Sequence, residues 1–155
     1  MEIRKFTCKD ALSVSVLIEK CFNTVNLGGH TEEGKQLQIE WNSPENLIKR
    51  AQAVRYFVAC EADRIIGICG YDMDKVQTLF VDVEYQNRGI GNTLLNKVLL
   101  EAVNERLTSL KTWATFYSEV FYSKSGFEKT GEIHLPEGRS DIILIEMLCD
   151  LSKLL

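Results

Sequence analysis

The chain has 155 residues, of which 45% are apolar and 26% are charged. This length is enough for one domain with a sizeable buried core, and we expect residues 1–155 to form a single domain. Eighteen Lys and Arg against 22 Asp and Glu give a formal net charge of -4. No long run of either sign is present, which argues against a nucleic-acid partner.

The five cysteines are scattered and never form a C-x-x-C pair. They predict neither a disulfide framework nor a zinc site, and they favour a reducing, cytoplasmic setting. The segment "MEIRKFTCKD" has no signal-peptide core, and no apolar stretch approaches the roughly 20 residues of a membrane span. We therefore expect a cytoplasmic protein without a membrane partner.

The first third of the chain predicts one strand and three helices. "EIRKF" is typical of a short strand, and Thr7 with Asp10 forms a capping-box pattern at the start of a helix. Apolar residues then recur at helical spacing, namely Ala11, Val14, Leu17, Ile18 and Cys21. Two short helices are expected next, one over 32–41 and one from Ser43, where a proline suits the first helical position.

The middle of the chain predicts three consecutive strands and a long helix. The strands are "RYFVAC", "IIGICGY" and "VQTLFVDV", and the short turns between them indicate an antiparallel meander. An amphipathic helix follows, with one apolar face that comprises Leu94, Leu95, Val98, Leu99, Ala102 and Val103.

The last third predicts a strand "LKTWATF", a short helix "YSEVFYSKS" and two closing strands, "FEKTGE" and "DIILIEML". The order of elements is β-α-α-α-β-β-β-α-β-α-β-β, without an internal repeat or a linker. This order predicts an α+β fold.

The stretch "VDVEYQNRGIGNTLL" places a strand, two glycines and a helix in succession. A helix that starts directly after a strand leaves its first N–H groups unpaired at the positive end of the helix dipole. Gly89 and Gly91 would let a phosphate approach the backbone N–H groups of residues 88–92, and Arg88 could add charge. The alternative is that the glycines only make a tight turn.

Two other phosphate-binding patterns fit less well. A dinucleotide fingerprint would have a third glycine where Leu94 stands. "GHTEEGKQ" matches a P-loop up to Lys35 but continues with Gln36 in place of the hydroxyl that would bind magnesium, so we expect a loop and a helix start there.

The glycine stretch resembles the acetyl-CoA pyrophosphate loop of the GCN5-related N-acetyltransferases (GNAT), with signature Q/R-x-x-G-x-G/A. Gln86, Gly89 and Gly91 match it. "FYSKSGFEKTGE" is similar to the "FY-x-K-x-GF" segment of the family, and the order of elements also agrees. The resemblance extends along nearly the whole chain.

The resemblance implies a mixed central sheet, flanked by helices, whose two middle strands splay apart around the pantetheine arm of acetyl-CoA. The backbone of Leu79, Phe80 and Val81 would pair with that arm as a neighbouring strand would. The pyrophosphate would lie on Asn87, Arg88, Gly89, Ile90, Gly91 and Asn92. Thr115 stands where many relatives have an Asn that bonds the cofactor.

Tyr122 matches the family tyrosine that lies near the cofactor sulfur and acts as the general acid. Its alternative role is a packed core aromatic, the role we assign to Tyr117 and Phe121. A backbone N–H near Val81 is the candidate to stabilise the oxyanion.

The identity of the general base stays open. Relatives often carry a Glu on one of the splayed strands, whereas this chain has Lys75, Gln77 and Leu110 near those places. Asp82 and Glu84 are the nearest carboxylates, but both are more typical of solvated residues at a strand end. A water chain or an already neutral amine is the other possibility.

We expect no metal, because His30 and His134 lie in apparent loops without partners at metal-ligand spacing. Cys69 is flanked by apolar residues and is more typical of a core residue than of a nucleophile.

The resulting hypothesis is an acetyl-CoA-dependent N-acetyltransferase that acts on an amine of a small molecule or a protein by direct attack in a ternary complex. The alternative is a non-catalytic acyl-CoA sensor. The resemblance places the acceptor pocket near residues 25–52, where acidic residues and an aromatic could bind a cation or form a solvated helix face (Glu32, Glu33, Glu40 and Trp41). A homodimer that pairs through "DIILIEML" is also possible.

Overall fold

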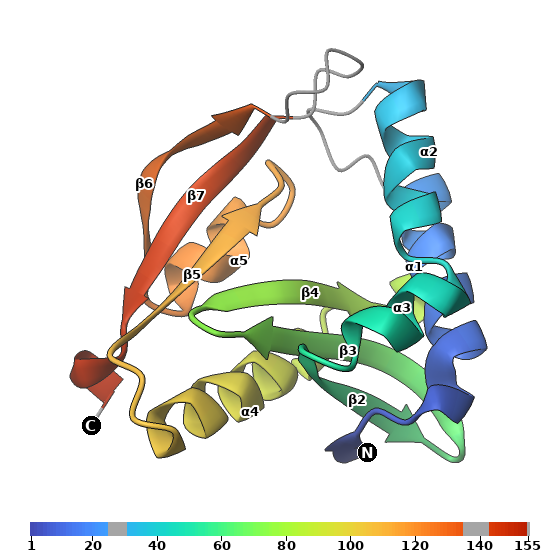
Figure 1. Ribbon diagram of the computed structural model, residues 1–155, viewed down its shortest axis with the longest axis horizontal. Helices are drawn as coiled ribbons and strands as arrows, with labels where there is room; N and C mark the ends of the chain where they lie inside the picture. Colours follow the sequence, from blue (N-terminus) through green and yellow to red (C-terminus); the bar gives the residue numbers. More distant parts are fainter. Residues whose placement is uncertain (25–30, 135–142, 155) are drawn as a thin grey trace.

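The computed structural model describes residues 1–24, 31–134 and 143–154, which build a seven-stranded mixed sheet flanked by helices (Figure 1). The strands are β1 (Glu2–Lys5), β2 (Arg55–Glu61), β3 (Arg64–Asp72), β4 (Lys75–Val81), β5 (Ser109–Ala114), β6 (Phe127–His134) and β7 (Ile143–Asp150). The helices are α1 (Ala11–Thr24), α2 (Glu32–Trp41), α3 (Pro44–Arg50), α4 (Ile90–Asn104) and α5 (Glu119–Lys124). Short 3-10 helices span Cys8–Asp10, Val83–Tyr85 and Leu151–Leu154.

The predicted order of elements and the α+β class are confirmed, and the three middle strands form the expected antiparallel meander. The sheet order is β1-β2-β3-β4-β5-β7-β6, and β4 and β5 are the parallel pair. Several strand bounds differ from prediction; for example, β5 ends at Ala114 and β6 runs on to His134. β4 ends at Val81 because the Asp82 side chain accepts a hydrogen bond from the Glu84 N–H and starts a 3-10 turn. The last strand runs on to Asp150, and residues 141–142 lie outside the described part.

The predicted capping box is present at the start of the first helical segment. The Thr7 N–H donates to Asp10 Oδ2 at 2.7 Å, and both guanidinium N–H groups of Arg4 donate to the same carboxylate at 2.8 and 2.9 Å. A single 3-10 turn, Cys8–Asp10, intervenes before α1 begins at Ala11. The carboxylate therefore fixes the end of β1 to the start of the helix.

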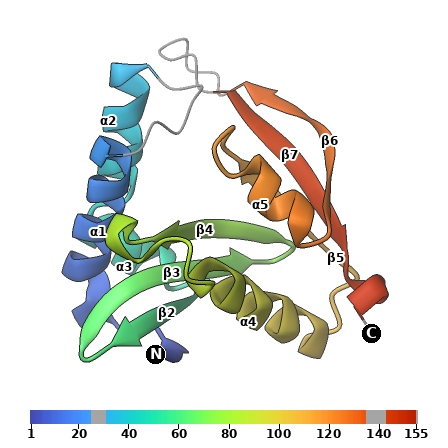
Figure 2. The same ribbon diagram turned by 180° about the vertical axis from the view of Figure 1, so that it is seen from behind.

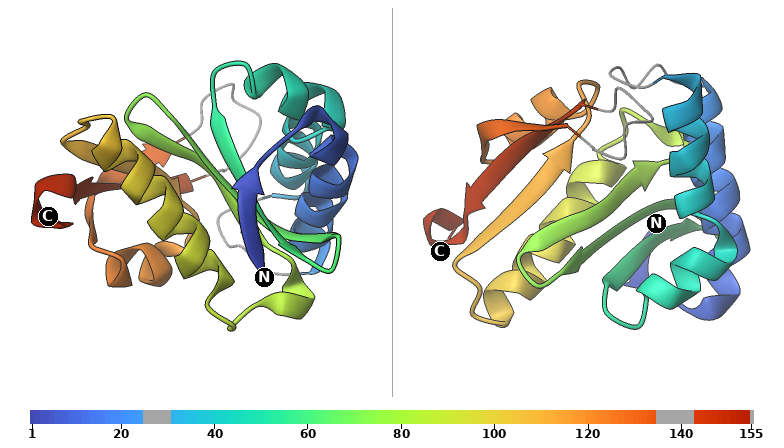
Figure 3. Two further views of the ribbon diagram at one scale, coloured as in Figure 1. Left: turned by 90° about the horizontal axis from the view of Figure 1, so that it is seen from below. Right: turned by 45° about the horizontal axis from the view of Figure 1, so that its top comes forward.

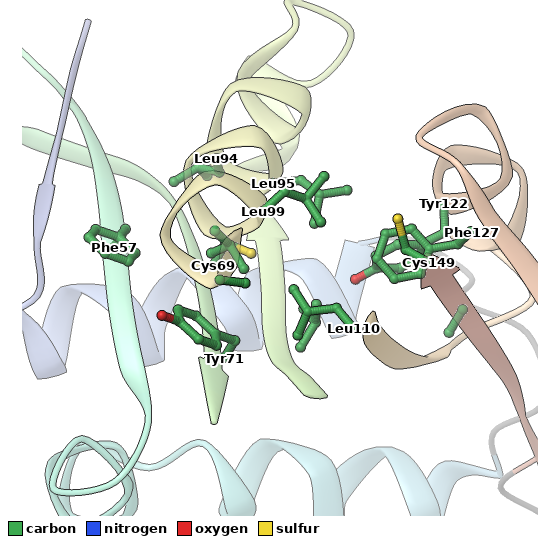
Figure 4. Packing of buried hydrophobic residues seen from close by; sticks show 14 of the residues in the cluster. Phe57, Cys69, Tyr71, Leu94, Leu95, Leu99, Leu110, Tyr122, Phe127 and Cys149 are labelled. Carbon is green, nitrogen blue, oxygen red and sulfur yellow. The ribbon is translucent and has the colours of Figure 1, made fainter. Parts of the chain in front are cut away.

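Helices cover both faces of the sheet and create two cores. α1 and α3 pack on one face, against residues of β2 and β3 such as Val58 and Ile68. α4 packs on the other face, against β2, β3 and β4 (Figure 2; Figure 3, left). Tyr122 of α5 belongs to this second core, where it lies beside Phe127 and Cys149 (Figure 4).

The predicted splaying of the two central strands is confirmed. β4 and β5 pair only at Lys75 with Lys111 and at Val76 with Thr112. Just beyond that point the register with β3 shifts, since Tyr71 faces Val76 whereas Gly70 faces Thr78. Gln77 is therefore one extra residue in β4, and such a bulge bends its strand. The bend accounts for the divergence of β4 from β5 (Figure 3, right).

Candidate active site

A cleft with a volume of about 1210 Å³ lies where β4 and β5 diverge. Its walls come from the whole of β4, the end of β5, the segment that leads into α4, α5, and residues of α1 and α2. The cleft therefore reaches from the N-terminus of α4 to the helices on the opposite face of the sheet. Most of the predicted cofactor-binding residues line it, namely Leu79, Phe80, Val81, Asn87, Gly89, Ile90, Gly91, Asn92 and Thr115.

The glycine loop, residues 86–91, places the N-terminus of α4 at the wall of this cleft. Asn87 and Gly89 adopt left-handed backbone conformations, with φ of 64° and 81°. Thr93 N–H is the first to bond within the helix, to the Gly89 carbonyl at 3.0 Å. Helix geometry leaves the N–H groups of the three preceding residues without intrahelical partners. N–H groups in this position, at the positive end of the helix dipole, are suited to bind an anion.

The two glycines serve different purposes. A Cβ on Gly89 would meet no atom within 4 Å, so its role there is the left-handed turn. A Cβ on Gly91 would lie 3.3 Å from Phe121 Cε2 and 3.6 Å from Val81 Cγ2. Gly91 therefore allows α4 to pack tightly against α5, which the sequence analysis did not predict.

Arg88 is the predicted loop residue that does not line the cleft. Its guanidinium carbon lies 5.0 Å from the centre of the Tyr85 ring. The backbone of the loop, rather than the Arg88 side chain, therefore faces the cleft in this conformation.

Gln86 and Tyr117 connect the two arms of the open sheet, a role that sequence reasoning missed. Gln86 Nε2 donates to the Val81 carbonyl at 3.1 Å, and the Tyr117 hydroxyl donates to Gln86 Oε1 at 2.9 Å. Tyr117 is 51% exposed, so its prediction as a packing residue is wrong, whereas Phe121 does pack against the core. The glutamine of the loop signature was the available signal for this link.

Tyr122 lines the cleft and is also buried in the core, with 5% of its surface exposed. Its ring makes edge contacts with Phe121 and Phe127, at centroid distances of 5.4 and 5.2 Å. Burial, with a smaller contribution from Cys69, raises the pKa of the Tyr122 hydroxyl despite the opposing influence of Thr112. The hydroxyl therefore stays protonated over the ordinary pH range and is available as a donor.

Asp82 is not a solvated residue, contrary to the sequence-based interpretation. It is 4% exposed, and its carboxylate bonds Lys20 Nζ at 3.0 Å and Arg64 Nη2 at 3.2 Å. Burial works to raise the pKa of Asp82, but the Glu84 N–H and the two cations together lower it. A carboxylate held in this way is a poor proton acceptor. Glu84 bonds the same two cations and is 60% exposed.

Thr115 lies at the cleft, but its hydroxyl is already engaged with α5. The Ser118 N–H donates to Thr115 Oγ1 at 3.1 Å, and the two side-chain oxygens lie 3.0 Å apart. The pair fixes the turn between β5 and α5. A cofactor bond from Thr115 would compete with these contacts.

The acidic residues proposed to receive a cation do not reach the cleft. Glu32, Glu33 and Glu40 are exposed on α2, and Glu32 pairs with Lys35 at 3.1 Å. Trp41 does line the cleft. The sequence "GHTEEGKQ" contains a helix start, as expected, because the Thr31 hydroxyl accepts a bond from the Gly34 N–H at 3.0 Å.

The remaining candidates behave as structural residues. Cys69 is completely buried, and burial raises the pKa of its thiol, which disfavours a nucleophilic thiolate. His134 is the exposed last residue of β6 rather than a loop residue, and His30 lies outside the described residues. Within residues 1–24, 31–134 and 143–154 no cluster of His, Cys, Asp and Glu side chains has the form of a metal site.

Among the helices described, none combines the length and the apolar character that a membrane crossing requires.

Comparison with known proteins places this geometry in a family. The model of the acetyltransferase (GNAT) domain family matches residues 27–149. An uncharacterised N-acetyltransferase of Methanocaldococcus jannaschii is 30% identical over 76 residues, which are 47% of this chain and 34% of that protein. The chain thus matches about a third of the length of that relative.

Two solved structures share the fold. A GCN5-related N-acetyltransferase from Rhodopseudomonas palustris superposes with a TM-score of 0.88 at 16% identity, over 96% of this chain and 94% of that one. The PaiA N-acetyltransferase of Thermoplasma acidophilum, solved in complex with coenzyme A, gives a TM-score of 0.78 at 21% identity, over 96% and 98% of the two chains. The chain belongs to the acetyltransferase (GNAT) domain family.

Proposed function

We propose that this acetyltransferase transfers an acetyl group from acetyl-CoA to a primary amine of a small molecule or a protein, by direct attack in a ternary complex. One observation carries the proposal: β4 and β5 separate after two paired residues, and the N-terminus of α4 opens onto the same cleft. An amide-rich chain that ends in a pyrophosphate matches both features.

The residues of this chain fit coenzyme A in two places. Asp82 N–H bonds the Ile66 carbonyl of β3, and successive strand residues direct their backbone groups to alternate sides. Leu79 and Val81 therefore face the space left by β5 and offer ladder groups to an extended amide chain, whereas Phe80 faces β3. The unpaired N–H groups at the start of α4 suit the pyrophosphate, and Gly89 leaves open space beside them. The PaiA complex with coenzyme A supports this assignment.

Acetyl-CoA would supply the activated thioester carbonyl. The chain would contribute a backbone N–H near Val81 to stabilise the developing oxyanion. The protonated Tyr122 hydroxyl would donate its proton, or a hydrogen bond, to the departing sulfur. Because Asp82 is bound by two cations, the amine would lose its proton to water or arrive neutral.

The test is thiol release from acetyl-CoA over a panel of polyamines, amino acids, aminoglycosides and peptides, alongside direct titration of acetyl-CoA binding. The proposal predicts tight binding and thiol release that depends on at least one amine. Binding without release for any amine would favour the acyl-CoA sensor. Absence of binding would contradict both functions.

We also propose that residues 1–155 act as one cytoplasmic domain. A homodimer stays a prediction, but the strand expected to pair across the dimer changes from β7 to β6. β7 pairs with both β5 and β6, so the edge available beside it belongs to β6.

A further inference from the structure

Lys75 projects into the part of the cleft away from the glycine loop. It is the first residue of β4 and lines the cleft at the end where β4 and β5 still pair. Val76 points into the core under α4, and successive strand side chains alternate between faces. The Lys75 side chain therefore lies on the opposite face, where α1 and α2 also contribute to the cleft wall.

Trp113 holds the Lys75 ammonium in place. Lys75 Nζ lies 3.0 Å from the centre of the Trp113 ring, a cation–π contact across the two strands. The Trp113 indole N–H donates to Glu146 Oε2 at 3.2 Å, and the Thr130 hydroxyl donates to Glu146 Oε1 at 3.2 Å. The ring is thus fixed from β6 and β7, and the ammonium has a defined position.

The positive charge of Lys75 lacks a direct carboxylate partner among the described residues. Lys111 is the ladder partner of Lys75 and forms an ion pair with Asp74 at 3.9 Å. In the described part of the chain, no ion pair includes Lys75. Burial, together with the charge of Lys111, lowers the pKa of Lys75 to about 8, and Glu146 and Asp74 act in the opposite direction. An anion beside Lys75 would favour its charged form.

The cleft wall around this end combines apolar and uncharged polar side chains. Leu37 and Trp41 of α2, Trp113 of β5 and Leu144 of β7 supply apolar surface, and Gln38, Asn42 and Gln77 supply polar groups. The charged side chains among the described lining residues are Lys75 and Lys124, both cations. A polycationic amine would meet like charge here, whereas an apolar molecule with one anionic group would find complementary contacts.

We propose that the acceptor is a small apolar amine that also carries a carboxylate, of the amino-acid class, and that Lys75 on Trp113 binds this carboxylate. The inference rests on the proposed acetyl transfer and narrows its acceptor. Lys75 is then a specificity-determining residue, because it selects the acceptor and exchanges no proton with it.

Matched acceptors test the proposal. Leucine and leucinamide, and phenylalanine and phenylalaninamide, differ in the carboxylate and, through it, in the pKa of the amine, which is lower in the amides. The values of kcat/KM are therefore compared per concentration of neutral amine. The wild type should show a kcat/KM about 10- to 100-fold higher for each carboxylate member, the range of one charge-assisted hydrogen bond. Lys75→Gln should abolish this preference by raising the KM for the carboxylate acceptors, whereas Lys75→Arg should retain the preference. Lys111→Gln is the matched control outside the cleft and should behave as wild type.

Binding gives a second readout, independent of turnover. N-acetylleucine, which has no titrating amine, is titrated into the protein saturated with CoA at pH 7 and pH 9. Its affinity should fall at pH 9 as Lys75 loses its proton, and it should not fall in Lys75→Arg. Lys111, Asp74 and Glu146 also face Lys75, and the charge of Lys111 lowers the pKa of Lys75. If Lys75 is the source of the fall, Lys111→Gln should therefore move the fall to higher pH and make it smaller at pH 9.

Three results would overturn the proposal: equal use of the amides and the carboxylates, a polyamine as the preferred acceptor, or loss of activity in Lys75→Arg as complete as in Lys75→Gln. The last result would identify Lys75 as a proton acceptor instead. Binding of acetyl-CoA with no amine-dependent thiol release would contradict the proposed function itself, which is a distinguishable outcome.

Discussion

Tyr122 is one side chain with two possible roles, because it belongs to the core and lines the cleft (Figure 4). Its sequence context alone favoured a packed aromatic, whereas the family resemblance favoured a general acid, which was the prediction. The structure keeps both, since the ring contacts Phe121 and Phe127 while the hydroxyl lies near Thr112. A substitution that removes only the hydroxyl separates the two.

Tyr122→Phe should lower kcat by about 10²- to 10⁴-fold, the usual contribution of general acid–base catalysis. The ring contacts stay, so acetyl-CoA affinity should change little. The measurement is kcat with the preferred acceptor, together with the Kd of acetyl-CoA on the same preparation. A kcat within a few-fold of wild type would leave Tyr122 with a packing role only.

Asp10 is a second residue whose effect can be predicted. Arg4, the largest influence, and the Thr7 N–H lower the pKa of Asp10 despite its burial. Asp10→Ala removes the cap and leaves Arg4 without its partner, which should cost about 1–3 kcal/mol of unfolding free energy at pH 7.

The folded-state pKa of Asp10 lies below its unfolded value of about 4. The stabilisation is therefore complete above that pH and is lost as pH falls through the lower, folded-state pKa. Urea unfolding of wild type and Asp10→Ala should show a difference that shrinks as pH falls below about 4. A difference that stays constant down to the acid transition would contradict this origin.

At the scale of elements, the loop between β4 and α4 combines a backbone requirement at Gly89 with a packing requirement at Gly91. The sequence predicted the strand, the turn and the helix, because hydrophobic period and glycine content are local signals. It did not predict the Gly91 contact with Phe121, since 30 residues separate the two positions in the chain. Nor could it show the extra residue in β4, because a bulge depends on the register with β3.

Gly89→Ala and Gly131→Ala form a matched pair, because a Cβ would meet no atom within 4 Å at either site. They differ in backbone conformation, since only Gly89 has a positive φ. Gly89→Ala should lower the unfolding free energy by about 1–2 kcal/mol, and Gly131→Ala should change it by about 0.5 kcal/mol or less. Urea unfolding measures both. Equal losses of unfolding free energy in the two variants would show that an alanine in the left-handed conformation at position 89 carries no cost.

At the scale of the whole molecule, the family resemblance supplied what local patterns could not. The mixed sheet and its splayed centre followed from the resemblance, and the structure confirms both. Side-chain environments were less predictable. Asp82 lies at a strand end, where solvation is the usual state, but two cations from α1 and β3 cover it. Such partners come from segments 62 and 18 residues away, and no local pattern reveals them.

We propose that acetyl-CoA occupies the space between β4 and β5 and completes the sheet. Amide hydrogen exchange, measured with and without saturating acetyl-CoA, tests this placement. Binding there should slow exchange at Leu79 and Val81 and at the start of α4, over 90–92, with little change in β1 and β2. Unchanged exchange at saturating acetyl-CoA, both in β4 and at the start of α4, would rule this placement out.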